Sequence, residues 1–267
     1  MDSVKERAIR AIIDTSIKSF ANGFELRHTS ERNDPLGTIN MKKNNCFIAA
    51  LGQEFIFYSA FVRSFDSSFG NLLEDLGNAI AKFSYITNRV IRSFMLPEQT
   101  QHISNLLDKY EDHLLMPDVS HYKNFFSVIP PNIESFKTQH ICDNWFFDSA
   151  TKTHYLIELK AGGDLDNKKA KSEKLALLKE YFMLRNIMPD DHKIFIKFAT
   201  AYNKFGEGKV WRQANVERMF ASEELLIGKD YWNFVCNDKD GFDIIFDQYK
   251  KSSQYIIDAI DRIKKIY

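Results

Sequence analysis

The feature that most constrains this chain is an apolar run that ends in two charged residues. The apolar residues 155–157 are followed by Glu158, Leu159 and Lys160. Such a continuous run predicts a strand that is buried on both faces. Residues two apart in a strand point to the same face, so Glu158 and Lys160 emerge side by side. A carboxylate and an ammonium are costly to desolvate, so their position at the end of a buried strand indicates that something binds there.

A second strand precedes this one and offers a further carboxylate. Asp143 follows Cys142 and comes just before the aromatic residues 145–147, and the polar residues 148–153 have the composition of a turn. Two strands joined by such a turn form a hairpin, which brings Asp143 toward Glu158. Asp148 is a rival for the first carboxylate. It opens the turn and would lie away from the strand ends, so Asp143 is preferred.

The chemistry of Asp143, Glu158 and Lys160 suits phosphodiester hydrolysis. Two carboxylates can hold Mg²⁺, which keeps several waters and meets a phosphate oxygen. A lysine beside the ion can stabilise charge on the phosphate or position the attacking water. The spacing alone is more typical of an ordinary hairpin with a surface ion pair. Such pairs, however, seldom end a continuously apolar strand.

A fourth charged residue, Glu74, lies on a predicted helix within a narrow face of small residues. It could approach the metal from there, or it is a solvated helix glutamate. The candidate catalytic residues are therefore Asp143, Glu158, Lys160 and Glu74. The candidate metal ligands are Asp143, Glu158 and Leu159.

Length and composition set the class of protein. The 267 residues are 44% hydrophobic and 27% charged, as in soluble globular proteins, and they are enough for a sizeable core. We predict a single nuclease domain over 1–267, with a helical N-terminal part over about 1–116 and a catalytic core over about 136–218. The absence of a long apolar run and of a signal-peptide pattern predicts a cytoplasmic location. Three well-separated cysteines argue against disulfides and against a zinc site.

The net charge of zero hides an uneven distribution. Residues 160–218 carry 13 basic and 8 acidic side chains, an excess of five positive charges directly after the Glu158–Lys160 strand. A local basic stripe matters more for phosphate contact than the overall charge, although solvated lysines on one helix would also account for part of it. The candidate phosphate contacts are Lys168, Lys169, Lys171 and Lys174, which fall in the first turns of a predicted helix. The candidate base-reading residues are Lys204, Lys209, Arg212, Gln213 and Arg218.

The remaining pattern predicts helices in the first third and strands after it. Helices are expected over 2–22 (closed by Gly23), over 46–64, from about 66 to about 94, over 98–116 and over 168–187, with two helical stretches over 242–266. A further strand is expected over 194–199, and residues 117–135 are expected to be irregular. Gly162 and Gly163 are expected to let the backbone bend around a bulky ligand. This order favours an α/β or α+β fold.

The spacing of Asp143, Glu158, Leu159 and Lys160 resembles the PD-(D/E)XK nuclease motif. The run ELKAGGDLDNKKAKSEKLALL resembles the TdeIII-like group of type II restriction endonucleases, as do RSFDSSFGNLLEDLGNAIAK upstream and ATAYNKFGEG and LLIGKDYWNFV downstream. Together they cover roughly residues 45–250 in the family's order. One departure is that Cys142 stands where the motif has proline before the aspartate.

This resemblance implies a PD-(D/E)XK fold with a central mixed sheet flanked by helices. It also implies a Mg²⁺-dependent homodimer that cuts both strands of double-stranded DNA at a short palindrome of the GGNCC type, with a cognate DNA methyltransferase as a separate protein. Three alternatives remain open: a structure-selective repair or recombination nuclease, a DNA-binding protein without catalytic activity, and a metabolite-binding α/β domain.

Overall fold

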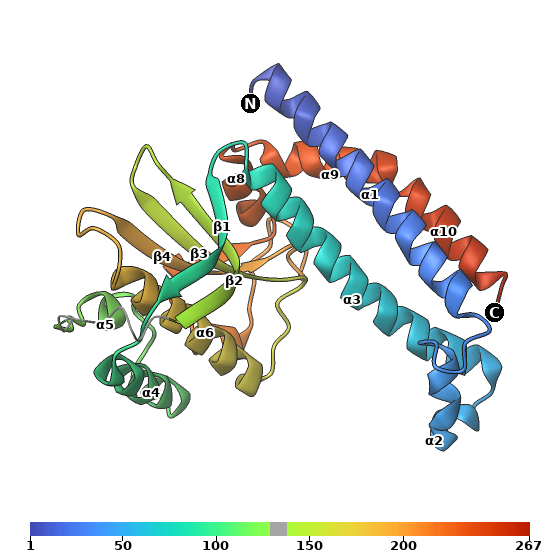
Figure 1. Ribbon diagram of the computed structural model, residues 1–267, viewed down its shortest axis with the longest axis horizontal. Helices are drawn as coiled ribbons and strands as arrows, with labels where there is room; N and C mark the ends of the chain where they lie inside the picture. Colours follow the sequence, from blue (N-terminus) through green and yellow to red (C-terminus); the bar gives the residue numbers. More distant parts are fainter. Residues whose placement is uncertain (129–137) are drawn as a thin grey trace. The chain divides into compact units, whose positions relative to one another are not determined.

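The computed structural model describes residues 1–128 and 138–267, and the chain divides into two compact units (Figure 1). The helical unit comprises residues 1–80 and 238–267, so it contains both ends of the chain. The sheet unit comprises residues 81–237. Among the described residues, no helix combines the length and apolarity needed to cross a membrane.

Helix α1 (Ser3–Glu31) forms the helical unit together with α9 (Gly241–Ser252) and α10 (Gln254–Lys264), which lie along it. Its N-terminus is capped by Asp2, whose carboxylate accepts hydrogen bonds from the backbone N–H groups of Val4 and Lys5. One apolar stripe of α1, which consists of Ile9, Ile13 and Ile17, is fully buried. The helix continues through Gly23, so the predicted end at that residue is wrong.

The rest of the helical unit is η1 (Asn40–Asn44), α2 (Cys46–Ala49) and the long helix α3 (Gln53–Ala81). Phe57 and Phe61 of α3 pack with Phe24 of α1 in an aromatic core. The prediction of two helices that meet near residue 66 is wrong, because α3 runs through that point without a break. The prediction that the second of these helices reaches residue 94 is also wrong, because α3 ends at Ala81.

The sheet unit is built on a five-stranded sheet whose strand order follows the chain. Its first three strands are antiparallel and its last three are parallel, so β3 has an antiparallel neighbour on one side and a parallel neighbour on the other. The predicted mixed sheet flanked by helices is confirmed at this level. The strands are β1 (Ile86–Ser93), β2 (Thr138–Asp148), β3 (Thr153–Lys160), β4 (Lys193–Thr200) and β5 (Leu225–Ile227).

Strand β1 replaces the end of the predicted third helix. Its eight residues include three β-branched apolar side chains, Ile86, Val90 and Ile91, besides Thr87, and such side chains favour strands. The pairing partner is β2, about fifty residues further along the chain, so the local apolar spacing alone does not indicate the strand.

Helices cover both faces of the sheet. On one face Leu178 and Phe182 of α6 (Asn167–Arg185) pack in a core with Leu156 of β3, and α4 (Pro97–Glu111) lies against α6. On the other face Phe234 of α8 (Lys229–Cys236) contacts the ring of Tyr155. Leu156 and Ile157 are both almost fully buried, which confirms that β3 is covered on its two faces. The short helices α5 (Ser120–Lys123), α7 (Ala214–Glu217) and η3 (Ser222–Glu224) connect these elements.

The segment predicted to be irregular, residues 117–135, contains α5 and falls partly outside the described residues. The predicted helices over 98–116 and 168–187 and the predicted strand over 194–199 correspond to α4, α6 and β4.

Candidate active site

The predicted charged pair lies at the C-terminal end of β3, the middle strand of the sheet. Glu158 and Lys160 are two residues apart and point to the same face, and the Lys160 ammonium donates to the Glu158 carboxylate. Lys160 also pairs with Glu173 of α6, whose Oε1 lies 3.0 Å from its Nζ. The lysine therefore sits between a strand carboxylate and a helix carboxylate.

Asp143 reaches the same end of the sheet from β2. The hairpin pairing ends at Asn144 and Ile157, so Asp143 and Glu158 are the next residues along the two strands, and the charge of Asp143 acts on Glu158. The β1–β2 pairing shifts register between Asn88 and Val90, and the extra β2 residues form a bulge that contains Asp143. Bulges bend a strand and re-aim its side chains, and here Asp143 is exposed while its two neighbours are buried. The hairpin prediction is confirmed.

The rival carboxylate, Asp148, lies at the opposite end of the hairpin, where it pairs with Thr153. Its Oδ1 accepts the backbone N–H of Ala150 at 3.0 Å, and its Oδ2 accepts the Thr151 hydroxyl at 2.8 Å. Asp148 thus stabilises the turn, a placement that favours Asp143 as the partner of Glu158.

Helix α6 adds a second buried carboxylate that the sequence reasoning missed. Glu180 is 6% exposed, and its Oε1 lies 3.0 Å from Nε2 of His140 on β2. Glu173 and Glu180 are seven residues apart, which places them on one side of α6 two turns apart. That spacing, with Glu180 set inside an apolar stretch, is the signal by which the sequence could have indicated both residues.

Four carboxylates therefore surround the end of β3; we call Asp143, Glu158, Glu173 and Glu180 the acidic cluster. Burial raises the pKa of Glu158 against the opposing effect of Lys160, and the charges of Asp143 and Glu173 raise it further. Burial likewise raises the pKa of Glu180 to about 8, with smaller contributions from Glu158 and Asp143. Burial is the largest cause of both shifts, and the neighbouring carboxylates add to it because their negative charges repel one another.

Few positive charges offset the acidic cluster. Burial would lower the pKa of Lys160, but Glu158 and Glu173 outweigh it and raise that pKa, so the lysine stays charged. Burial and the charge of Lys179 lower the pKa of His140, which favours its neutral form beside Glu180. An added cation would relieve the excess negative charge.

The donor set of the acidic cluster fits a hard divalent cation. Mg²⁺ prefers oxygen ligands and is commonly held by one or two carboxylates and several waters. Within the described ranges, no three His, Cys, Asp or Glu residues form a group that could by itself hold a metal ion. Asp143 and Glu158 are the residues that would hold it. Leu159 could contribute only its backbone carbonyl, because its side chain is apolar.

Glu74 lies on α3, in the helical unit, whereas the acidic cluster lies in the sheet unit. Its backbone carbonyl accepts a hydrogen bond from the Asn78 side chain. A role for Glu74 at the metal remains a prediction.

The four lysines predicted to contact phosphate differ in their surroundings. Lys168 and Lys169 are near the start of α6, and both are exposed. Lys171 pairs with Asp108 at 2.8 Å and with Glu111 at 2.5 Å, so its charge is already compensated.

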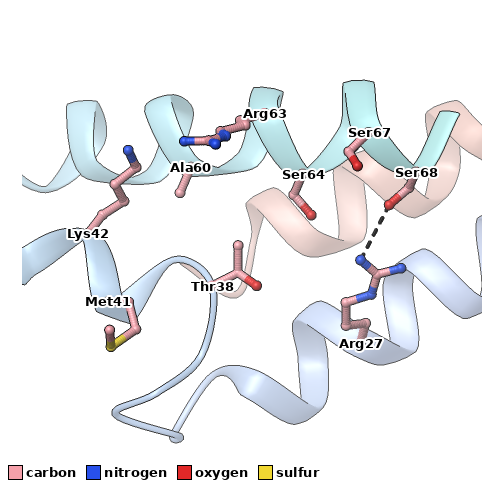
Figure 2. Close-up of a pocket in the computed structure, with 9 residues that line it drawn as sticks. All are labelled: Arg27, Thr38, Met41, Lys42, Ala60, Arg63, Ser64, Ser67 and Ser68. Carbon is pink, nitrogen blue, oxygen red and sulfur yellow. Dashed lines mark hydrogen bonds between the residues drawn. The ribbon is translucent and has the colours of Figure 1, made fainter. Parts of the chain in front are cut away.

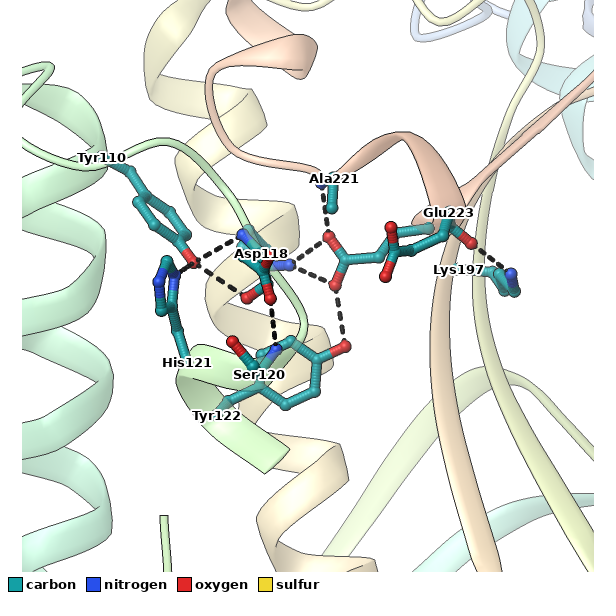
Figure 3. A network of polar contacts seen from close by, with 10 residues as sticks. Tyr110, Asp118, Ser120, His121, Tyr122, Lys197, Ala221 and Glu223 are labelled. Carbon is teal, nitrogen blue, oxygen red and sulfur yellow. Dashed lines mark hydrogen bonds and ion pairs between the residues drawn. The ribbon is translucent and has the colours of Figure 1, made fainter. Parts of the chain in front are cut away.

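Lys174 is not a phosphate contact in this structure, because its side chain is 1% exposed. Its Nζ lies 2.6 Å from both carboxylate oxygens of Glu224, which also accepts the Tyr122 hydroxyl and the Ala221 N–H (Figure 3). Position in the first turns of α6 indicated an exposed lysine, but this side of the helix faces the core. Lys174 is thus a structural residue.

The loop after β3 and the loop after β4 are joined through Asp164. Its Oδ1 accepts hydrogen bonds from Lys204 at 3.1 Å and from Gln213 at 2.5 Å. Arg212 is 75% exposed and pairs only loosely with Glu217, at 3.8 Å. Lys209 is exposed as well, whereas Arg218 donates to Asn167 at 3.1 Å. The structure therefore brings Lys204, Gln213 and Arg218 to the segment that follows β3.

The glycines of that loop have a packing role in the structure. Gly163 has φ +70°, and a Cβ there would lie 2.5 Å from Cγ2 of Thr200. A Cβ on Gly162 would lie 2.5 Å from the Tyr202 hydroxyl. The chain's own side chains therefore pack closely against both glycines, and the expected bend around a bulky ligand stays a prediction.

A model of the type II restriction endonuclease family HinfI matches residues 5–253 of this chain. The chain belongs to the HinfI family. It is therefore a restriction endonuclease, a nuclease whose substrate is DNA and which cleaves at specific sites. No curated protein and no solved structure matches the chain. The expectation of a type II restriction endonuclease is confirmed, while the resemblance to the TdeIII-like group stays a prediction.

Proposed function

We propose that this HinfI-family endonuclease hydrolyses phosphodiester bonds of duplex DNA with Mg²⁺ at the end of β3, within a PD-(D/E)XK type of site. The observation that carries the proposal is the acidic cluster around Lys160: buried carboxylates whose pKa values are raised, next to a strand end and an exposed aspartate. Carboxylates whose pKa values are shifted by burial and by neighbouring charges are typical of functional sites.

Each residue of the site has a separate role in this proposal. Asp143 and Glu158 would hold the ion, which when bound supplies Lewis-acid polarisation of the scissile phosphate and neutralises its charge. Lys160, kept protonated by its carboxylate neighbours, positions the attacking water and stabilises charge on the phosphate. Glu173 retains Lys160 in place when Glu158 turns to the ion. The products carry 5′-phosphate ends.

Cleavage of plasmid and of a short duplex, with Mg²⁺ and with EDTA, tests these roles. Glu158→Gln and Lys160→Ala should each lower the cleavage rate by about 10²-fold or more, because each removes a group that acts on the reacting phosphate. Matched controls are Asp191→Asn and Lys152→Ala, an exposed ion pair at the other end of the sheet, and both should cleave as the unmodified protein does.

Two results would contradict this assignment of the site. One is full activity of Lys160→Ala in the presence of Mg²⁺. The other is a dead Asp148→Asn together with an active Asp143→Asn, since Asp148 would then be the metal carboxylate. Thermal unfolding of every variant separates damage to the site from damage to the fold.

We also propose that Lys168 and Lys169 bind DNA phosphates, which position the duplex without reading its sequence. Neutralising either lysine should weaken binding to all duplexes alike. It should also reduce the slope of log affinity against log salt concentration by about one unit for each phosphate that is no longer neutralised. Lys171→Gln, whose charge is already paired with Asp108 and Glu111, should change the slope less.

For specificity we propose that the enzyme acts as a homodimer on a GC-rich palindrome of the GGNCC type, with Arg212 and Lys209 as the guanine-reading residues. Arg meets the O6 and N7 acceptors of guanine at once, and a good bidentate contact discriminates by about 1–3 kcal/mol. The exposure of Arg212 and its long distance from Glu217 leave its guanidinium available. A two-fold dimer would repeat the contact on the second strand.

Cleavage of a library of randomised duplexes by the unmodified enzyme and by Arg212→Ala tests this specificity. Relaxed selection at one symmetric pair of positions would support readout by Arg212. An equal decrease at every sequence would assign Arg212 to the scaffold, and a selected site without guanine would refute the GC-rich target. Sedimentation with and without duplex gives the stoichiometry that the dimer requires.

A further inference from the structure

The helical unit contains a cavity of about 420 Å³ between α1, η1 and α3 (Figure 2). Three cationic side chains line it, one from each of these elements: Arg27, Lys42 and Arg63. No carboxylate belongs to its lining among the described residues. All of its lining residues lie within residues 1–80, so the cavity is complete within this unit.

The charges of these cations are poorly compensated. Among the residues that the structure describes, neither Lys42 nor Arg63 forms an ion pair. Arg27 donates to the Ser68 hydroxyl, at 3.3 Å, and its guanidinium lies 5.9 Å from the centre of the Phe24 ring. Three like charges around one cavity repel one another, and an anion between them would turn that repulsion into attraction.

The wall opposite η1 is a face of hydroxyl groups on α3. Ser64, Ser67 and Ser68 follow the three- and four-residue spacing of one helix side, and all three line the cavity (Figure 2). Serine is neither apolar nor a strong helix former, so three of them on one side are not explained by helix propensity. Hydroxyl groups beside guanidinium and ammonium groups are the donors that phosphate oxygens accept.

One of these serines is supported from behind by a buried histidine. Ser64 is 9% exposed, and its Oγ lies 3.2 Å from Nε2 of the fully buried His28. Burial lowers the pKa of His28, which keeps the ring neutral. When Nε2 carries the proton, it donates to Ser64 and leaves the hydroxyl hydrogen of Ser64 for a ligand in the cavity.

We propose that this cavity binds a phosphate group through Arg27, Lys42, Arg63 and the hydroxyls of α3. Its volume exceeds that of one phosphate, so the sugar or base attached to the phosphate has room beside it. The phosphate is either a backbone group of the DNA substrate, which rests on the proposed function, or part of a free phosphorylated molecule, which does not.

The double variant Lys42→Gln/Arg63→Gln tests the cavity against the control Arg7→Gln/Lys265→Gln. The control removes the same two charges from exposed positions elsewhere in the helical unit. Both proteins are titrated with pyrophosphate by calorimetry and with duplex DNA over a range of salt concentrations, in EDTA so that no cleavage occurs. These binding measurements do not depend on the catalytic residues.

The cavity variant should bind at least one of the two probes, pyrophosphate or duplex DNA, about tenfold or more weakly, because two charge-assisted hydrogen-bond donors are removed. The control should bind both probes as the unmodified protein does. A weaker duplex affinity, with a salt slope reduced by about one unit for each phosphate no longer neutralised, identifies DNA as the source. Abolished pyrophosphate binding with unchanged duplex affinity identifies a free phosphorylated molecule.

Ser67→Asp provides a second variant, since Ser67 is exposed and a carboxylate there would repel phosphate without removing a cation. It should be impaired for the same probe as the double variant. The proposal is overturned if the cavity variants bind both probes as tightly as the control and the unmodified protein do. Catalytic-site variants that keep full cleavage activity, while the cavity variants lose binding, would count against the nuclease site alone and leave the cavity proposal standing.

Discussion

At the scale of single residues, Lys174 and Glu224 show how a charged pair is used inside the sheet unit. The two side chains are 1% and 2% exposed and pair directly, and Tyr122 and Ala221 donate to the remaining acceptor positions of Glu224. A buried pair with all its partners is tolerated, whereas an uncompensated buried charge is strongly unfavourable.

Glu224→Gln should therefore lower the free energy of unfolding by about 3–5 kcal/mol, because the Lys174 ammonium would have no counter-charge. Urea unfolding measures the change. The double variant Lys174→Met/Glu224→Gln should recover part of the stability, since no charge is then left in the core. A single variant that is as stable as the unmodified protein would mean that water reaches Lys174.

A second buried network, at the turn end of the hairpin, predicts a dependence of stability on pH. The Trp145 indole N–H donates to Nδ1 of His154 at 3.0 Å, and Nε2 of His154 lies 2.9 Å from Nδ1 of His192. An indole can only donate, so Nδ1 of His154 must be unprotonated and its Nε2–H donates to His192. Protonation of His154 would break the hydrogen bond with Trp145.

Burial, with a contribution from His192, lowers the pKa of His154 from 6.5 to about 4. The unfolded chain therefore binds more protons than the folded one between these values, and stability is full above about pH 6.5 and falls as the pH falls toward 4. Between about pH 7 and pH 5 the expected decrease is about 2 kcal/mol.

Urea unfolding at these two pH values measures this decrease in the unmodified protein. His154→Gln should remove most of the difference, whereas His113→Asn, at an exposed position, should leave it unchanged. An equal pH effect in all three proteins would assign the titration to other groups.

At the scale of elements, we expect alanine substitutions at two glycines to change the free energy of unfolding in opposite directions. Gly163→Ala should cost about 1–3 kcal/mol, because its φ of +70° disfavours a side chain and a Cβ would lie 2.5 Å from Thr200 Cγ2. Gly23 lies inside α1 with nothing within 4 Å of a built Cβ, so Gly23→Ala should stabilise by about 0.5–1 kcal/mol. Thermal unfolding of both variants measures the two stability changes. Two changes of the same sign would contradict the different roles given to Gly163 and Gly23.

The elements also show where sequence reasoning succeeds. The hairpin of β2 and β3 is predictable because its apolar run, its turn and its charged end lie within about thirty residues and each is a local signal. Asp143, Glu158 and Lys160 follow from that hairpin. Gly23, by contrast, falsely indicates a helix end, because a glycine after an apolar stripe is typical of one although packing carries α1 past it.

Sequence reasoning failed where the decisive partner is distant in the chain. Strand β1 exists because it pairs with β2, and its spacing continues the apolar pattern of α3 by chance. Glu173 and Glu180 belong to the candidate site because α6 packs on β3, and Lys174 is buried because Glu224 comes to it from fifty residues away. Such contacts are tertiary, so the residue types of one segment do not reveal them.

At the scale of the whole molecule, the division into two units changes the description that the sequence suggests. Residues 81–237 hold the acidic cluster, the loops with Arg212 and the buried Lys174 pair, whereas the proposed phosphate cavity lies in the helical unit. The predicted helical part over 1–116 includes β1, which belongs to the sheet unit. The two proposals of binding and cleavage can therefore be tested separately, since no residue is shared between them.

The pairing of α1 with α9 and α10 has a consequence for the order in which the protein folds during its synthesis on the ribosome. Ile9, Ile13 and Ile17 leave the exit tunnel well before the helices that cover them, which are made only after the sheet unit. The sheet unit, a continuous segment, can fold during translation, whereas α1 keeps an apolar stripe exposed until residues 254–264 have emerged. In the nascent chain α1 therefore lacks its partners α9 and α10 until after the sheet unit has been made, and the helical unit is completed last.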